Sequence, residues 1–114
     1  MSVPVAPWQV WWANLNPQVG REQAGDRPVI VVGTELACRL PNNLVLIVPC
    51  THRDRQLPWQ PRVVLSGDPG FAMCDQVKAI DRSRLRKPHA ARVVSSDDRA
   101  VIAAALRQLI SVTS

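Results

Sequence analysis

The stretch from residue 16 to residue 32 constrains the fold of this chain most strongly. Its first half contains Pro17, Gly20 and Gly25, which interrupt regular structure. Its second half, residues 29–32, is a run of β-branched residues, which is the composition of a buried strand. A polar loop therefore enters a strand, and Arg27 stands at the junction. A guanidinium held at such a rigid position is well suited to bind a phosphate group.

The length and the cysteine content predict one small domain in a reducing compartment. The chain has 114 residues, so we expect a single domain over residues 1–114, whose modest core a dimer would support. The longest apolar run, residues 44–50, is too short to cross a membrane, and the N-terminus lacks the pattern of a secretory signal, so we expect a cytoplasmic protein. The cysteines are widely spaced without a C-x-x-C motif, which predicts buried, reduced thiols and no metal site.

The charge balance has two explanations that the sequence leaves open. The formal net charge is +5, and 12 of the 14 basic residues are arginine. Arginine presents a planar fork to phosphate, so this composition suits a nucleic-acid partner. An excess of arginine also arises in a genome rich in G and C.

The first half of the chain predicts three strands. Residues 8–15 alternate as a strand, with Trp8, Val10 and Trp12 on one face; we expect Trp12 to serve packing, whereas Trp11 could pack or stack on a base. The second strand is residues 29–32, and residues 35–43 are short and broken. The third strand, residues 44–51, is continuously apolar, which predicts burial on both faces, and it ends at Thr51.

The second half predicts a hairpin, a short strand and a helix. Residues 62–65 and 71–74 form the hairpin, joined by S-G-D-P-G. Residues 75–80 are extended, residues 81–87 a basic turn and residues 92–94 a last strand. Ser95 caps a helix whose apolar stripe is Val101, Ile102, Ala105, Leu106, Leu109 and Ile110. The fold class is therefore mainly β (β+α): a small, strongly bent antiparallel barrel with a C-terminal amphipathic helix.

Several ordered motifs resemble one known family. The string N-P-x-x-G-x-E-Q-A-G-x-R-P-V-I-V-V at residues 16–32 resembles the signature of MazF/PemK-type toxins, the endoribonucleases of bacterial type II toxin–antitoxin pairs. The strings W-W-A-N-L-N-P, L-V-L-I-V-P-C-T, V-V-L-S-G and D-Q-V-K-A-I-D-R-S-R-L extend the resemblance from residue 8 to residue 110. It implies an SH3-like, CcdB/PemK-type barrel that forms a homodimer and binds a cognate antitoxin. It also implies metal-independent, sequence-selective cleavage of single-stranded RNA without a cofactor, which inhibits translation and growth.

The resemblance also implies site residues. By motif, Arg27 and Thr51 are the catalytic pair, Glu22 takes part in substrate handling, and Asp75 is a further candidate. The remaining candidates for substrate binding or an auxiliary role are Gln23, His52, Arg53, Gln76 and Lys78. Each has a structural alternative: Arg27 could pair with Asp26 or Glu22 to fix the loop, and Thr51 could simply end a strand.

The chemistry of RNA explains why such a pair would suffice. The 2′-hydroxyl is an internal nucleophile, so the protein need only align it and stabilise charge on phosphorus, giving a 2′,3′-cyclic phosphate and a 5′-hydroxyl. Arginine cannot act as the base in its ordinary protonated state. His52 follows Thr51 directly, but strand alternation would direct it away from the site unless a loop reverses it. We expect His89 to be solvated surface.

The chain also departs from the family pattern. Pro7, Trp8 and Gln9 replace the Arg-Gly-Asp/Glu that usually opens the first strand, and Met73 stands where the PemK branch has arginine.

Two other functions stay open. One is a CcdB-like inhibitor of DNA gyrase, although residues 111–114 are polar where CcdB carries Trp-Gly-Ile. The other is a binder of single strands, although one Phe and no Tyr leave few stacking side chains.

Overall fold

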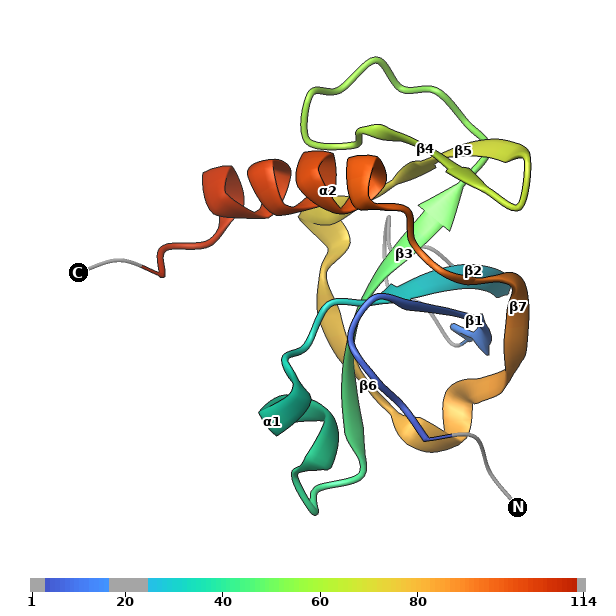
Figure 1. Cartoon of the computed structure of the whole chain (residues 1–114), viewed down its shortest axis with the longest axis vertical. Coiled ribbons are helices and arrows are strands. Elements are labelled where there is room, and N and C mark those ends of the chain that lie inside the picture. Colours follow the sequence, from blue (N-terminus) through green and yellow to red (C-terminus); the bar gives the residue numbers. More distant parts are fainter. Residues whose placement is uncertain (1–3, 17–24, 113–114) are drawn as a thin grey trace.

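A curled antiparallel sheet forms the body of the protein, and a C-terminal helix lies across one side of it (Figure 1). The computed structural model describes residues 4–16 and 25–112. Within these residues the hydrogen-bonded strand order is β4-β5-β3-β2-β1-β7, and β6 pairs with β3. The expected mainly β fold with a terminal helix is confirmed. The strands are β1 (Gln9–Asn14), β2 (Asp26–Val31), β3 (Leu44–Thr51), β4 (Arg62–Leu65), β5 (Asp68–Ala72), β6 (Lys78–Asp81) and β7 (Leu85–Val93).

Two α-helices and two short 3-10 helices connect or cover these strands. Helix α1 (Glu35–Arg39) begins at Thr34, whose hydroxyl accepts a hydrogen bond from the Ala37 amide. The 3-10 helix η1 (Cys74–Gln76) precedes β6, and η2 (Arg82–Arg84) precedes β7. Helix α2 (Ser96–Leu109) begins at Ser95 as predicted, with the Ser95 hydroxyl accepting from the Asp98 amide. Among the described residues, neither helix is long and apolar enough to span a membrane.

The hydrophobic core lies on both faces of the sheet, and β2 contributes to each. Ile30 packs in a cluster with α2, whereas Val29 and Val31 pack in a second cluster with Trp11. All three β2 residues have no exposed surface, so the prediction of a buried strand is confirmed. Trp11 is 7% exposed, which identifies it as a core residue.

Fewer side chains are buried at the start of β3 and along α2 than the sequence predicted. Leu44 and Leu46 are 39% and 42% exposed, so β3 is covered on both faces only toward its end. On α2, Ile102 and Ala105 are buried and Leu106 is partly buried, while the rest of the predicted stripe is exposed. The helix contacts η1 and β4, so only a narrow part of its surface is covered. The exposed stripe residues are Val101, Leu109 and Ile110.

The β4–β5 hairpin is tighter than predicted. Ser66 and Gly67 both have positive φ, 53° and 78°, and they alone form the turn, because Leu65 pairs with Asp68. A two-residue turn of this kind matches the twist of the strands it joins. Strand β5 therefore begins at Asp68, three residues before the predicted position at Phe71.

The C-terminal strand is also longer than predicted. Strand β7 covers 9 residues and pairs with β1, where the prediction gave a basic turn and a short strand at residues 92–94. Its pairing with β1 shifts register between Gln9 and Trp11 and again between Trp12 and Ala13. These irregularities interrupt the alternation by which a strand is recognised in sequence. Residues 75–80, predicted extended, contain the end of η1 before β6 begins.

Candidate active site

Arg27 and Thr51 line one pocket, although they belong to different strands. Val29 of β2 pairs with Pro49 of β3 in an antiparallel register. Arg27 lies two residues before Val29, and Thr51 lies two residues after Pro49, so this register brings both to the same end of the strand pair. The pocket has a volume of about 200 Å³. It is lined by Trp12, Asp26, Arg27, Pro28, Cys50, Thr51, His52, Val63, Leu65, Asp68, Pro69 and Gly70.

Thr51 is held firmly in the wall of this pocket. It is 7% exposed, and its Oγ1 accepts a hydrogen bond from the Arg53 amide at 3.2 Å. It pairs with Phe71 of β5, and a Cβ added at Gly70 would lie 3.0 Å from the Thr51 carbonyl oxygen. Strand β5 approaches β3 so closely because Gly70 has no side chain. The Thr51 hydroxyl therefore has a fixed position and can still donate its hydrogen to a bound group.

His52 lies in the pocket lining, which agrees with the alternative of a loop conformation and not with strand alternation. Residue 52 follows the last residue of β3, so the alternation rule no longer applies to it. Its Nε2 lies 2.8 Å from Oδ2 of Asp68, the first residue of β5. The sequence predicts Asp68 in a turn and does not place it in the site. The two-residue S-G turn was the signal that could have placed it at the start of a strand.

Trp12 and His89 form an aromatic contact beside the pocket, and the prediction that His89 is solvated surface is wrong. The Trp12 ring lines the pocket, and it lies 5.1 Å from the His89 ring, centroid to centroid. His89 is 7% exposed, not solvated, and its Nδ1 accepts a hydrogen bond from the Ala91 amide. Burial lowers the pKa of His89 below its ordinary value, and the charge of Asp68 acts in the opposite direction.

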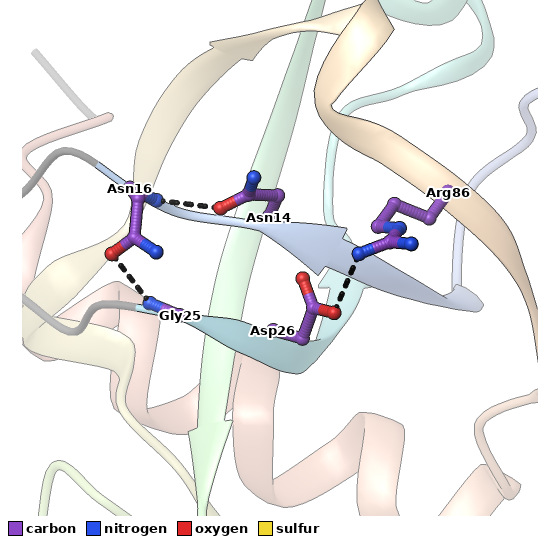
Figure 2. Close-up of polar contacts among 5 residues, drawn as sticks. All are labelled: Asn14, Asn16, Gly25, Asp26 and Arg86. Carbon is purple, nitrogen blue, oxygen red and sulfur yellow. Dashed lines mark hydrogen bonds and ion pairs between the residues drawn. The ribbon is translucent and has the colours of Figure 1, made fainter.

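Asp26 is neutralised by a partner from another strand. Its Oδ2 lies 2.7 Å from Nη1 of Arg86 in β7 (Figure 2). The same figure shows how the chain is closed just before Asp26: the Gly25 amide donates to Asn16 Oδ1, and the Asn16 amide donates to Asn14 Oδ1. These contacts fix the start of β2, and with it the backbone of Arg27.

The other predicted site residues that the structure describes do not line this pocket. Asp75 accepts a hydrogen bond from Gln60 Nε2 at 3.0 Å, and Gln76 Nε2 contacts Met73 Sδ at 3.6 Å, both at η1. Lys78 lies on β6, paired with Ile47. Arg53 is adjacent to the pocket, because its backbone amide donates a hydrogen bond to Thr51 Oγ1, but it is not among the lining residues. Glu22 and Gln23 lie outside the described residues.

The cysteines are protonated thiols in the core. Burial raises the pKa of Cys50 to about 12, with the neighbouring Cys74 adding to the effect. Burial likewise raises the pKa of Cys74 to about 12. All three cysteines are free, as predicted. Within residues 4–16 and 25–112, no group of three or more His, Cys, Asp or Glu side chains is placed to hold a metal ion.

Comparison with solved structures defines the class of this fold. The chain superimposes on MazF of Deinococcus radiodurans with a TM-score of 0.79 at 25% identity, covering 95% of this chain and 97% of that one. It also matches a mycobacterial endoribonuclease in complex with its cognate antitoxin, with a TM-score of 0.77 at 18% identity, which shows a shared fold alone; 96% of this chain and 98% of that one are covered.

Sequence comparison gives the family. Residues 6–110 match the family described as PemK-like, MazF-like toxin of type II toxin–antitoxin system. The endoribonuclease toxin MazF of Escherichia coli K12 is 39% identical over 71 residues, which are 60% of this chain and 61% of that protein. The endoribonuclease EndoA of Bacillus subtilis is 30% identical over 82 residues, 67% of this chain and 70% of that protein. The chain belongs to this PemK-like, MazF-like toxin family, and a CcdB-like gyrase inhibitor is not favoured.

Proposed function

We propose that this protein is the toxin of a bacterial type II toxin–antitoxin pair and a metal-independent, sequence-selective endoribonuclease. The observation that carries this proposal is that Arg27 and Thr51 line one pocket. The names of the E. coli and B. subtilis relatives, both endoribonucleases, support the same activity. The substrate is single-stranded RNA, whose cleavage in the cytoplasm stops translation and growth.

The chemistry follows from the two side chains. In the proposed reaction the 2′-hydroxyl attacks the adjacent phosphorus, and the bond to the 5′-oxygen breaks. The Arg27 guanidinium donates hydrogen bonds to the phosphoryl oxygens and stabilises the extra negative charge of the transition state. The Thr51 hydroxyl donates to another oxygen of the same phosphate. Because the nucleophile belongs to the substrate, this pathway does not call for a metal-activated water.

Two partners complete the proposal. The protein acts as a homodimer, since a chain of this size buries a modest core and exposes large apolar side chains such as Leu36 and Leu40. A cognate antitoxin neutralises it by covering the pocket. The MazE–MazF structure of D. radiodurans, at 26% identity and a TM-score of 0.73, supports such a partner.

Cleavage of defined RNA tests the activity. The purified protein should cut a single-stranded RNA in the presence of EDTA and leave a 2′,3′-cyclic phosphate and a 5′-hydroxyl, identified by end labelling. Arg27→Ala should lower kcat/KM by about 10³-fold or more. Arg107→Ala, an exposed arginine near the end of α2, is the matched control and should cleave normally. Full activity of Arg27→Ala would remove Arg27 from the mechanism, and intact RNA under every condition would reject the enzyme.

A further inference from the structure

The proposed reaction needs a group that accepts the proton of the 2′-hydroxyl. Arginine is protonated at any physiological pH, and a threonine hydroxyl is too weak a base for this step. Neither Arg27 nor Thr51 can therefore complete the chemistry. Among the described residues that line the pocket, His52 supplies a suitable nitrogen in its imidazole.

The geometry around His52 is that of an oriented base. Its Nε2 lies 2.8 Å from Oδ2 of Asp68. A carboxylate acceptor at Nε2 favours the neutral tautomer that carries its hydrogen there, which leaves the lone pair on Nδ1. The carboxylate also stabilises the imidazolium that forms when Nδ1 takes up a proton. The same division of roles makes histidine a general base in many hydrolases.

The fold fixes both members of this pair independently of one another. His52 directly follows Thr51, which pairs with Phe71 of β5. Asp68 starts the same strand β5, immediately after the tight turn of Ser66 and Gly67. The close approach of β5 to β3 at Gly70 therefore determines how far Asp68 lies from His52.

Stability does not account for the pair. The His52 and Asp68 side chains are 70% and 56% exposed. Even as an ion pair, a contact so open to water would contribute only about 0–1 kcal/mol to folding. Both residues nevertheless line the pocket that contains Arg27 and Thr51. An exposed imidazole can also exchange its proton with solvent after each turnover.

We propose that His52 is the general base of the cleavage reaction and that Asp68 is its positioning residue; this rests on the proposed endoribonuclease function. The 2′-O–H proton passes to His52 Nδ1 while the 2′-oxygen forms its bond to phosphorus. The bond from phosphorus to the 5′-oxygen breaks, and that oxygen takes a proton from a solvent water. The resulting hydroxide takes the proton from the imidazolium, which regenerates water and the neutral base.

Other charged or titratable groups around this pocket also affect the pH dependence of the cleavage rate. Asp26 and Arg27 come from β2, Asp68 comes from β5, and His89 of β7 stacks on Trp12 in the lining. Arg53 follows His52 in the chain. A pH profile of the wild-type protein alone therefore contains several titrations, and the profile of each variant must be compared with it.

The experiment measures single-turnover cleavage by the full chain, with RNA in its natural form and with sulfur replacing the 5′-oxygen at the cleaved linkage. Sulfur leaves without a proton, so only a defect in the base step persists on that substrate. His52→Gln should cleave both substrates about 10²- to 10⁴-fold more slowly than wild type and lose the acidic limb of the pH–rate profile. Asp68→Asn should be slowed about 10- to 100-fold on both substrates, with the loss in the maximal single-turnover rate and not in the RNA concentration that half-saturates it.

The matched control for Asp68→Asn is Asp97→Asn, an exposed aspartate in the first turn of α2, which should cleave like wild type. Circular dichroism should show native spectra for all three variants, because the His52–Asp68 pair is exposed. Wild-type rates in His52→Gln would overturn the proposal, as would a defect that disappears on the sulfur substrate, which would make His52 an acid. Failure of the wild-type protein to cut any RNA would instead reject the proposed function, and the base with it.

Discussion

The imidazole of His89 lies 5.1 Å from the indole of Trp12, with the two ring planes inclined by 34°. The contact joins β7 to β1 across the sheet and buries a titratable ring beside the candidate active site. A buried neutral histidine resists protonation, so the stability of this part of the fold depends on pH.

The free energy of unfolding should fall as the pH is lowered through the range around 6.5, the ordinary pKa of histidine. Burial lowers the pKa of His89 in the folded protein, so the unfolded chain binds more protons there and acid favours unfolding. The contribution is complete above this range and is lost below it. Urea denaturation at pH 7.5 and pH 5.5 measures the difference, which should be smaller in His89→Gln than in wild type. An equal or larger difference in the variant would contradict the assignment to His89.

Removal of Arg86 should weaken RNA binding more than folding. The Asp26–Arg86 pair is exposed, so Arg86→Gln should change the free energy of unfolding by less than about 1 kcal/mol. The variant leaves the Asp26 carboxylate uncompensated in the pocket that we propose binds phosphate, which should raise KM about two- to fivefold. The double variant Asp26→Asn/Arg86→Gln should restore KM. A KM that stays high in the double variant would show that Arg86 contacts RNA itself.

Gly70→Ala should destabilise the protein by about 1–3 kcal/mol, because the new methyl group would meet the Thr51 carbonyl oxygen at 3.0 Å. Chemical denaturation measures the loss, and cleavage should fall with it because β5 must move away from Thr51. Gly67→Asn on the same hairpin is the matched control. Its φ of +78° is one that asparagine tolerates, and nothing lies within 4 Å of the new Cβ, so we expect a change below about 1 kcal/mol.

Thr51→Val should distinguish the contribution of the Thr51 hydroxyl to cleavage from that of the side-chain shape. Valine fills the same volume but cannot donate to a phosphate oxygen, so the proposed role predicts a loss of about 10- to 100-fold in the single-turnover cleavage rate. The variant also removes the acceptor of the Arg53 amide, at a cost of about 1 kcal/mol in stability. Thr51→Ser keeps the hydroxyl and should remain active. A fully active Thr51→Val would assign Thr51 a structural role only.

The sequence predicted where the site residues lie along the chain better than it predicted which of them come into contact. The positions of Arg27 at the entry to β2 and Thr51 at the end of β3 followed from composition, because polar loops meet β-branched runs there. Their presence in one pocket depends on the pairing of Val29 with Pro49. The connection between β2 and β3, residues 32–43, contains α1, and a strand pattern carries no information about the geometry of such a connection.

The pocket residues that were missed come from contacts distant in sequence. Trp12 lies near His89 because β1 pairs with β7, and the register shifts in that pairing obscure the period of both strands. Asp68 was assigned to a turn because Asp, Pro and Gly are all frequent in turns. The S-G dipeptide was the one local signal for a shorter turn, in which Ser66 and Gly67 both have positive φ.

The hydrogen bond between Asn16 and Gly25 also determines how far the length of the segment between them can vary. The Leu15 amide donates to the Gly25 carbonyl and the Gly25 amide donates to Asn16 Oδ1, so the residues that flank segment 17–24 are held together. Lengthening a segment whose ends are already joined costs little, about 0.6 kcal/mol for each doubling. An insertion between Asn16 and Gly25 should therefore leave the backbone of Arg27, two positions after Gly25, in place.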